Sequence, residues 1–221
     1  MKPLSIKILN DELWFPSPEE ARPDGLLAIG GDLSPERLIL AYHRGIFPWS
    51  VEPISWWSPD PRAVFDMHRF HLSRRVQRVI KQRKFAVTFD QAFEQVIKSC
   101  AKPAKGREET WISQEFIAAY SQLHKRGYAH SVECWLNKEL VGGVYGVSLG
   151  AFFAGESMFY RESNASTVAL FHLMERLQKS GYQLFDTQML TNHTERLGAY
   201  HIPRSEYLKR LEIALRTITV F

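Results

Sequence analysis

Hydrophobic and polar positions follow a regular order from Phe85 to the end of the chain, and their period changes between about two and about 3.6 residues. Runs with a short period or a continuous apolar core predict strands, and longer runs with apolar residues three and four apart predict helices. A tight turn at Asn137 and Lys138 joins two of the strands. Strands are predicted at 85–89, 130–136, 139–149, 150–159 and 183–188, and helices at 90–101, 113–126, 164–179, 193–198 and 204–215.

The strand at 150–159, GAFFAGESMF, combines an apolar run with a carboxylate. Its first half suits a strand covered on both faces, and Gly155 then marks a bulge or a close backbone approach. Because residues two apart share a strand face, we expect Glu156 and Met158 to project the same way. A carboxylate in an apolar strand is costly unless it is paired or used, so Glu156 is the first candidate for a site.

Residues 1–62 differ from the rest, because Pro, Gly and Trp are concentrated there in FPSP, DGLLAIGGDLSP, GIFPWS and WWSPDPR. One helix is predicted, with Ser34 as its N-cap and Gly45 at its end, and the remainder is expected to be loops. We therefore predict a small loop-rich N-terminal domain at 1–62, followed by a second domain at 63–221. Trp49 stands alone after a proline and is favoured as a functional residue over a packing one.

The segment HRFHLSRRVQRVIKQRK at 68–84 predicts a basic amphipathic helix capped by Ser73. The chain has no acidic residue between Asp66 and Asp90, whereas a solvated helix surface normally mixes charges of both signs. This one-sided charge favours a nucleic acid partner over a plain basic surface, and the apolar face is too narrow for a helix lying on a membrane. The candidate contacts are Arg74, Arg75, Arg78, Lys81, Arg83 and Lys84.

Charge and cysteine content add little beyond this. The 221 residues carry a net charge of +4, which is mildly basic. No apolar run is long enough to span a membrane, and the first residues do not resemble a secretory signal. The two cysteines, Cys100 and Cys134, have neither disulfide nor metal spacing, which fits a reducing compartment and predicts a cytoplasmic protein.

A second group of polar residues lies at the end of the strand at 183–188, where Asp186 and Gln188 are expected to share a face. If this strand lies beside 150–159, then Glu156, Asp186 and Gln188 converge next to an apolar pocket, an arrangement that suits a cationic amine attacking a carbonyl. A buried polar network that only fixes the core is the alternative. Ser157 is expected to face the other way, and the sequence contains no metal-ligand spacing, P-loop or dinucleotide fingerprint.

The order of elements after Phe85 resembles the acyltransferase fold of the GNAT superfamily, which is α+β with a mixed, largely antiparallel sheet and flanking helices. A fold alone does not give the substrate. In that superfamily the turn after the third meander strand carries a Gly-rich pyrophosphate loop, whereas this turn reads YRESNAS. Backbone amides close less easily on a pyrophosphate without glycine, which argues against coenzyme A.

Longer motifs make a more specific resemblance. The segments FPSPEEARPDGLLAIGGDLSPERLILAYHRGIFPW, WWSPDPR, TWI, HSVECW, LVGGVYGVSLG, FFAGESMF, NAS and DTQ…NHTERLGA together resemble the bacterial leucyl/phenylalanyl-tRNA–protein transferases from about Leu13 to Tyr207. The resemblance implies transfer of Leu, Phe or Met from aminoacyl-tRNA to the N-terminal Arg or Lys of a protein, which marks that protein for degradation. It implies a monomer with no metal or redox cofactor.

The resemblance also implies roles for particular residues. Trp49 and Trp111 flank the 3′-terminal adenosine, and the basic helix holds the acceptor stem through its phosphates. The aminoacyl side chain is held by Phe153, Met158, Val144, Leu170 and Phe185, with Tyr42 and Tyr120 as further substrate contacts. Glu156 anchors the acceptor amine or its basic side chain.

For Asp186 and Gln188 the family proposal is a proton-handling pair. A neutral amide is too weak a base for an ammonium, so we expect Asp186 to orient Gln188, whose carbonyl oxygen holds the attacking amine. Two alternatives remain open, namely another GNAT-like acyltransferase, using coenzyme A or making peptidoglycan cross-bridges, and a non-catalytic module that binds RNA ends or N-terminal peptides.

Overall fold

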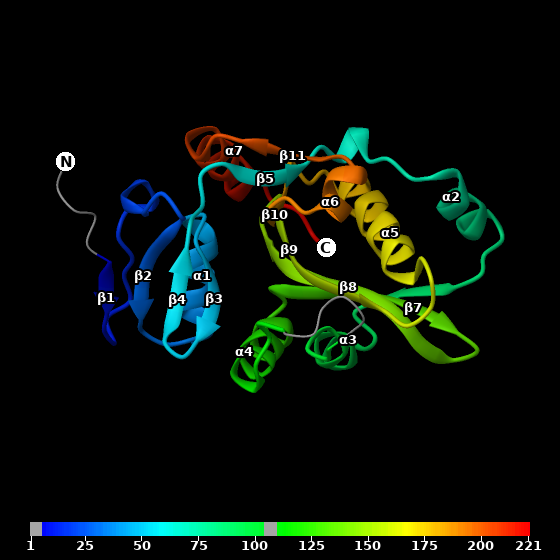
Figure 1. Cartoon of the computed structure of the whole chain (residues 1–221), viewed down its shortest axis with the longest axis horizontal. Helices are drawn as coiled ribbons and strands as arrows, with labels where there is room; N and C mark the ends of the chain where they lie inside the picture. Colours follow the sequence, from blue (N-terminus) through cyan, green and yellow to red (C-terminus); the bar gives the residue numbers. More distant parts are fainter. Residues whose placement is uncertain (1–5, 104–109) are drawn as a thin grey trace.

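The computed structural model describes residues 6–103 and 110–221, and these residues form two β-sheets with helices around them (Figure 1). The first sheet has four strands in the order β1-β2-β4-β3, and the second has seven in the order β11-β5-β10-β9-β8-β7-β6. The strands are β1 Lys7–Leu9, β2 Leu26–Gly30, β3 Phe47–Val51, β4 Ile54–Trp57, β5 Arg62–Phe65, β6 Ala86–Phe89, β7 Ala129–Leu136, β8 Glu139–Leu149, β9 Phe152–Tyr160, β10 Leu184–Gln188 and β11 Ala199–Ile202.

Seven α-helices accompany these strands in the described part of the chain. They are α1 Pro35–His43, α2 Arg74–Lys81, α3 Phe93–Cys100, α4 Gln114–Lys125, α5 Ala165–Lys179, α6 Asn192–Arg196 and α7 Arg204–Arg216, and short 3₁₀ turns lie at Pro18–Glu20 and Met67–Arg69. Ser34 and Ser73 cap α1 and α2 as predicted, each accepting a hydrogen bond from the backbone three residues on.

The predicted GNAT-like arrangement is confirmed. Strands β6 to β9 form an antiparallel meander, and β10 adds to β9 in parallel, beyond the intervening helix α5. The tight turn between β7 and β8 has positive φ at both Asn137 and Lys138, 52° and 66°, which is the geometry of a two-residue hairpin turn.

The prediction that residues 1–62 consist of one helix and loops is wrong, because β1 to β4 form a sheet there. The signal was weak, since these strands have three to five residues and contain Gly30 and Pro48. Pro48 is tolerated because β3 is an edge strand, where a missing N–H leaves no partner unsatisfied.

Two further strands, β5 and β11, also escaped prediction, and both extend the large sheet beyond β10. Each has only four residues, too few to show a period. β5 begins at Arg62 and brings that residue into the large sheet beside β10. The domain boundary predicted between residues 62 and 63 stays a prediction.

Two apolar clusters cover the faces of the large sheet. Helices α3 and α4 lie on one face, and α5 and α2 lie on the other (Figure 1). The cluster on the α3 and α4 face continues into the small sheet and includes Trp56, Phe116 and Tyr120. The cluster on the α5 face includes Val144 and Leu170. Cys134 belongs to this second cluster, and burial raises the pKa of its thiol to about 12.

Candidate active site

β9 contains a bulge at Glu156, as Gly155 predicted. Because the bulge inserts one extra residue, it interrupts the alternation of side chains and corrects the expectation that Glu156 and Met158 share a face. Met158 packs on the cluster of α5, whereas the Glu156 carboxylate contacts Tyr120 of α4 on the opposite face. The register pairs on the two sides of the extra residue are Tyr145 with Ser157 and Gly146 with Gly155.

β9 and β10 diverge after a short paired stretch, and a pocket of about 190 Å³ opens between them. Their parallel pairing covers only Phe152–Ala154 and Leu184–Asp186. A pocket with apolar walls and a few convergent polar groups is the usual form of a small-ligand site. The lining residues are Phe65, Val144, Gly155, Glu156, Ser157, Met158, Leu170, Phe185, Thr187, Gln188, Met189, Thr191 and Thr194.

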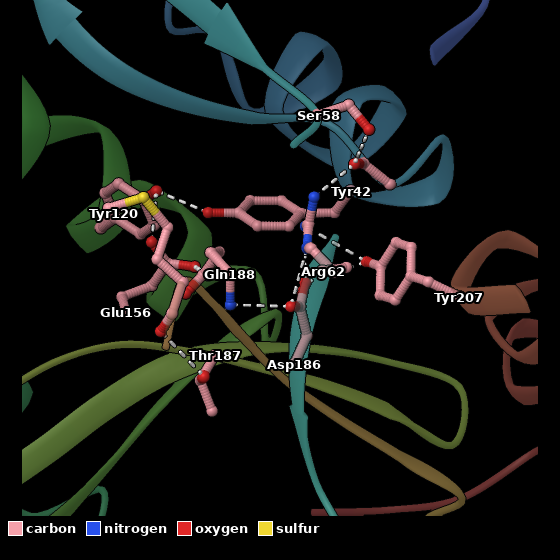
Figure 2. A network of polar contacts seen from close by, with 11 residues as sticks. Tyr42, Ser58, Arg62, Tyr120, Glu156, Asp186, Thr187, Gln188 and Tyr207 are labelled. Carbon is pink, nitrogen blue, oxygen red and sulfur yellow. Dashed lines mark hydrogen bonds and ion pairs between the residues drawn. The ribbon is translucent and has the colours of Figure 1, made fainter. Parts of the chain in front are cut away.

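Gln188 reaches Glu156 because the end of β10 is irregular. The register against β5 shifts between Asp186 and Gln188, and Gln188 has a φ of +57°, a conformation that is uncommon outside glycine. The Asp186 carboxylate stabilises this turn by accepting the Gln188 backbone N–H at 2.8 Å. The Gln188 carboxamide then donates from Nε2 to Glu156 Oε1 at 3.0 Å, which directs its carbonyl oxygen away from Glu156 (Figure 2).

Glu156, Asp186 and Gln188 converge as expected, because Gln188 bonds to both carboxylates, but Asp186 does not line the pocket. Arg62 binds it instead, and both side chains are buried, at 1% and 0% exposure. The contact has two points, Nε to Oδ1 at 2.9 Å and Nη2 to Oδ2 at 2.6 Å (Figure 2). The Tyr207 hydroxyl donates to the same carboxylate at 2.9 Å. Asp186 is therefore a compensated charge that orients the backbone of Gln188.

Arg62 also ties the small sheet to this site. It donates from Nη1 to the carbonyl oxygen of Gly45, at the end of α1, at 3.0 Å. Gly45 has a φ of +71°, and a Cβ there would lie 2.8 Å from the Tyr207 ring, so this close approach requires glycine. Burial would lower the pKa of Arg62, but the charge of Asp186 raises it above its usual range.

Glu156 has a different environment, made of hydroxyl groups rather than a cation. The Tyr120 hydroxyl donates to Glu156 Oε2 at 3.2 Å, and the Tyr42 and Tyr120 hydroxyls lie 2.6 Å apart. Burial raises the pKa of both tyrosines well above the usual range, so they remain protonated donors. Burial also raises the pKa of Glu156 to about 7. The hydrogen bond from Tyr42 acts to lower this pKa, and the negative charge of Asp186 acts to raise it. Glu156 can therefore change its charge near neutral pH.

The two tryptophans predicted to act together do lie together. Trp49 and Trp111 are stacked, with ring centroids 6.4 Å apart and planes 22° from parallel. Trp111 contacts Phe116 edge-on at 5.0 Å, and Phe116 lies 6.2 Å from Tyr120, which binds Glu156. This aromatic series connects the tryptophan pair to the carboxylate.

Four of the five residues predicted for the apolar pocket line it, namely Val144, Met158, Leu170 and Phe185. Phe153 does not. It is 1% exposed and lies behind Phe185, edge-on at 5.4 Å. Ser157, expected to face away, lines the pocket because of the bulge.

The basic segment forms α2 and the turn after it, on the α5 face of the large sheet (Figure 1). Its six predicted contacts, Arg74, Arg75, Arg78, Lys81, Arg83 and Lys84, are all exposed. Lys84 pairs with Glu162 at 3.0 Å. Val76 and Leu72 are buried against the cluster of α5, as the amphipathic pattern predicts.

Arg62 and Tyr207 are the site residues that sequence reasoning missed. Arg62 ends the quoted motif WWSPDPR, and an arginine directly before the apolar run AVF gave the same signal as Glu156, a charge in a buried strand. Tyr207 gave no comparable signal, because one aromatic on an amphipathic helix normally packs in a core.

Residues 6–103 and 110–221 contain no cluster of three or more His, Cys, Asp and Glu side chains arranged to bind a metal ion. Over the same ranges, no helix has the length and apolar character needed to cross a membrane.

Comparison with known proteins gives consistent matches over most of the chain. The family described as leucyl/phenylalanyl-tRNA protein transferase matches residues 64–212, and its N-terminal domain matches residues 31–60. The leucyl/phenylalanyl-tRNA–protein transferase of Syntrophobacter fumaroxidans is 52% identical over 206 residues, which cover 92% of this chain and 88% of that protein. The protein of that name from Klebsiella pneumoniae strain 342 is 50% identical, covering 94% and 90%.

Among solved structures, FemX aligns with 69% of this chain and 64% of its own, at 10% identity and a TM-score of 0.45. The sequence matches are far stronger and cover both sheets. By these matches the chain belongs to the leucyl/phenylalanyl-tRNA protein transferase family.

Proposed function

We propose that this protein transfers Leu, Phe or Met from aminoacyl-tRNA to the N-terminal Arg or Lys of acceptor proteins, forming a peptide bond and a degradation signal. Family membership supports the reaction class. The observation that carries the proposal is the hydrogen-bonded pair of Glu156 and Gln188 at the mouth of an apolar pocket. We expect the enzyme to act as a monomer, which sedimentation can check.

The donor substrate has two parts that need different surfaces. The apolar walls formed by Val144, Met158, Leu170 and Phe185 suit an apolar aminoacyl side chain that is not branched at Cβ, such as that of Leu, Phe or Met. The stacked pair of Trp49 and Trp111 suits the terminal adenosine, because unpaired bases stack on aromatic side chains. The tRNA end would then lie on the α3 and α4 face, with its ester at Glu156.

The acceptor amine needs a group that attracts a cation and an acceptor that aims its lone pair. Glu156 provides a carboxylate above about pH 7, and Gln188 provides a carbonyl oxygen directed away from Glu156. Held between them, an N-terminal ammonium has two acceptors and faces the ester from one side. Much of the rate can come from this positioning, because the ester is already activated.

In the proposed reaction, one proton of the acceptor ammonium is transferred to the protein. The ammonium gives a proton to the Glu156 carboxylate, and the free amine attacks the ester carbonyl carbon. A carbon–nitrogen bond forms, the carbon–oxygen ester bond breaks, and the terminal ribose hydroxyl leaves with the second proton of the amine. Asp186 takes no proton here, because Arg62 and Tyr207 occupy it. Glu156 returns its proton to solvent when the product leaves.

The test is transfer of radiolabelled leucine from Leu-tRNA to two peptides that differ only in a first residue of Arg or Ala. We expect label on the Arg peptide alone. Equal labelling of both peptides would contradict acceptor selection. Intact tRNA binding with no transfer would support a binding module, and consumption of acetyl-coenzyme A would support the other acyltransferase reading.

A further inference from the structure

Residues 217–221 follow α7 as a C-terminal tail, and this tail ends between β9 and α5 (Figure 1). Its side chains alternate between two sides. Ile218 and Val220 point outward and are 95% and 80% exposed, whereas Thr219 and Phe221 are partly buried. Thr219 Oγ1 donates to a backbone carbonyl oxygen of the β8–β9 turn at 2.6 Å. The tail is therefore attached to the turn from which β9 leads to the candidate active site.

Phe221 packs on the apolar cluster of the α5 face and is held there by several groups. Its ring stacks on His130 of β7, with centroids 4.1 Å apart and planes 21° from parallel. The His130 ring is oriented in turn by Asp90, whose Oδ2 lies 2.8 Å from its Nδ1. The Arg176 guanidinium of α5 lies 4.9 Å from the centre of the Phe221 ring. These contacts give the ring one defined position.

An aromatic row leads from Phe221 to the pocket of the candidate active site. The rings of Phe221 and Phe153 are stacked, at 5.8 Å and 19° from parallel. Phe153 meets Phe185 edge-on at 5.4 Å, and Phe185 lines the pocket. A Cβ on Gly146 of β8 would lie 2.5 Å from the Phe153 ring, so the absence of a side chain there makes room for the row. One ring therefore separates Phe221 from the pocket wall.

Phe185 is held in place by its neighbours. Its ring lies against the backbone of β9, since a Cβ on Gly155 would be 2.7 Å from it. Phe65 of β5 contacts it at 5.2 Å, and Phe153 contacts it edge-on. Closely packed rings move only when a neighbour gives way. The position of Phe153, and of Phe221 behind it, therefore sets where this wall of the pocket lies.

We propose that Phe221 is a positioning residue that sets the depth of the aminoacyl pocket, and with it the choice between a Leu and a Phe donor. This rests on the proposed function, because it takes the pocket to hold the donor side chain. Without the Phe221 ring, Phe153 and Phe185 can relax into the vacated space, and a larger side chain gains room. Such selection by pocket shape is limited, since one methylene changes kcat/KM only about 10–200-fold.

The test measures transfer from leucyl-adenosine and from phenylalanyl-adenosine to an Arg peptide. These donors carry the ester and the base without the rest of the tRNA, so other RNA contacts do not affect the result. The variants are Phe221→Ala, Phe221→Leu and Phe89→Ala. Phe89 is the matched control, because its ring contacts Phe221 at 6.3 Å but, among the described residues, has no ring contact with Phe153 or Phe185. Thermal melting of each variant verifies that it is folded.

We expect Phe221→Ala to raise the ratio of kcat/KM for the phenylalanyl donor to that for the leucyl donor about fivefold. Phe221→Leu keeps most of the apolar volume and should leave the ratio near that of the unmodified enzyme. Phe89→Ala should lower the melting temperature without changing the ratio, because a loss of stability alone affects both donors equally. An unchanged ratio in Phe221→Ala, a shift toward the leucyl donor, or an equal shift in Phe89→Ala overturns the proposal.

The unmodified enzyme separates this proposal from the proposed function. If it accepts only aminoacyl-tRNA, the same ratio is measured with Phe-tRNA and Leu-tRNA. No transfer from the adenosine esters or from either tRNA would refute the proposed function, and the role of Phe221 with it. Transfer from both donors, with an unchanged ratio in Phe221→Ala, would refute only the role of Phe221.

Discussion

The two carboxylates of the site, the buried Asp186 and the half-buried Glu156, lie on neighbouring strands and have opposite surroundings. Asp186 faces an arginine at two points, a tyrosine hydroxyl and a backbone N–H, all within 2.9 Å. Glu156 faces a tyrosine hydroxyl and a neutral carboxamide. The charge of Asp186 is compensated by a cation in direct contact, whereas Glu156 forms no ion pair with any described residue, although the charge of Arg62 still acts to lower its pKa.

The difference assigns the two groups to different tasks. A carboxylate held by a buried guanidinium is a fixed part of the structure, and removing either partner leaves an unpaired buried charge. A carboxylate without a cation, and with a pKa raised to about 7, can accept a cationic substrate and its proton. Because no cation of the protein pairs with Glu156, the N-terminal ammonium of an acceptor would bind at this carboxylate.

The largest effect is expected from breaking the Arg62–Asp186 pair. Arg62→Met should lower the free energy of unfolding by about 3–5 kcal/mol, because Asp186 is left charged and buried. Asp186→Asn should cost much less in the Arg62→Met background than alone. Urea unfolding of the four proteins in this cycle measures the coupling.

The matched control is Asp32, which pairs with the buried Arg37 at 3.1 Å but is 48% exposed. Asp32→Asn should cost about 1 kcal/mol or less. If the Arg62 and Asp186 costs simply add, the pair does not act as a unit and the proposed difference between the two carboxylates fails.

A smaller effect, on rate alone, is expected at Gln188, which connects the two carboxylates. Gln188→Ala should reduce the single-turnover rate of transfer about a hundredfold, because the amine loses an acceptor that aims it. Gln188→Glu should also be slow, because it places a second negative charge beside Glu156. Near-normal rates for both variants would remove Gln188 from the mechanism, and unfolding curves like that of the unmodified protein would exclude a folding defect.

Much of the large sheet and part of this site could be predicted from the sequence. In long segments such as 139–149 the period of apolar residues identifies the type of element. The position of Gly155 beside Glu156 predicted the bulge correctly. The small sheet, β5 and β11 could not be predicted, because strands of three to five residues carry no period and take their shape from neighbours.

The pairing of Asp186 with Arg62 shows most clearly what the sequence could not predict. Spacing of two residues predicted that Asp186 and Gln188 share a face, but the positive φ of Gln188 and the register shift beside it separate them. Arg62 lies 124 positions before Asp186 in the chain. Such a pairing depends on which strands become neighbours, and local pattern does not specify this.

The smallest effect, and the one that separates the two carboxylates most directly, is expected from Glu156→Gln. This change keeps the shape of the side chain and removes its charge, so kcat/KM for an Arg peptide should fall about tenfold at pH above 7. The unmodified enzyme should lose kcat/KM as the pH falls below about 7, because Glu156 becomes protonated. The Gln variant should lack this acid limb, and unchanged peptide affinity would remove the anchoring role.

Stability gives the same comparison without substrate. The pKa of Glu156 is raised from 4.5 to about 7, so between these values the folded state holds a proton that the unfolded chain has released. Glu156 therefore lowers the free energy of unfolding as the pH rises through this window. Relative to the unmodified protein, Glu156→Gln should gain stability from about pH 4.5 to about pH 7 and show no further change above it. Glu212→Gln, at an exposed helix position, should show no such gain, and a pH-independent difference for Glu156→Gln would mean that Glu156 is compensated like Asp186.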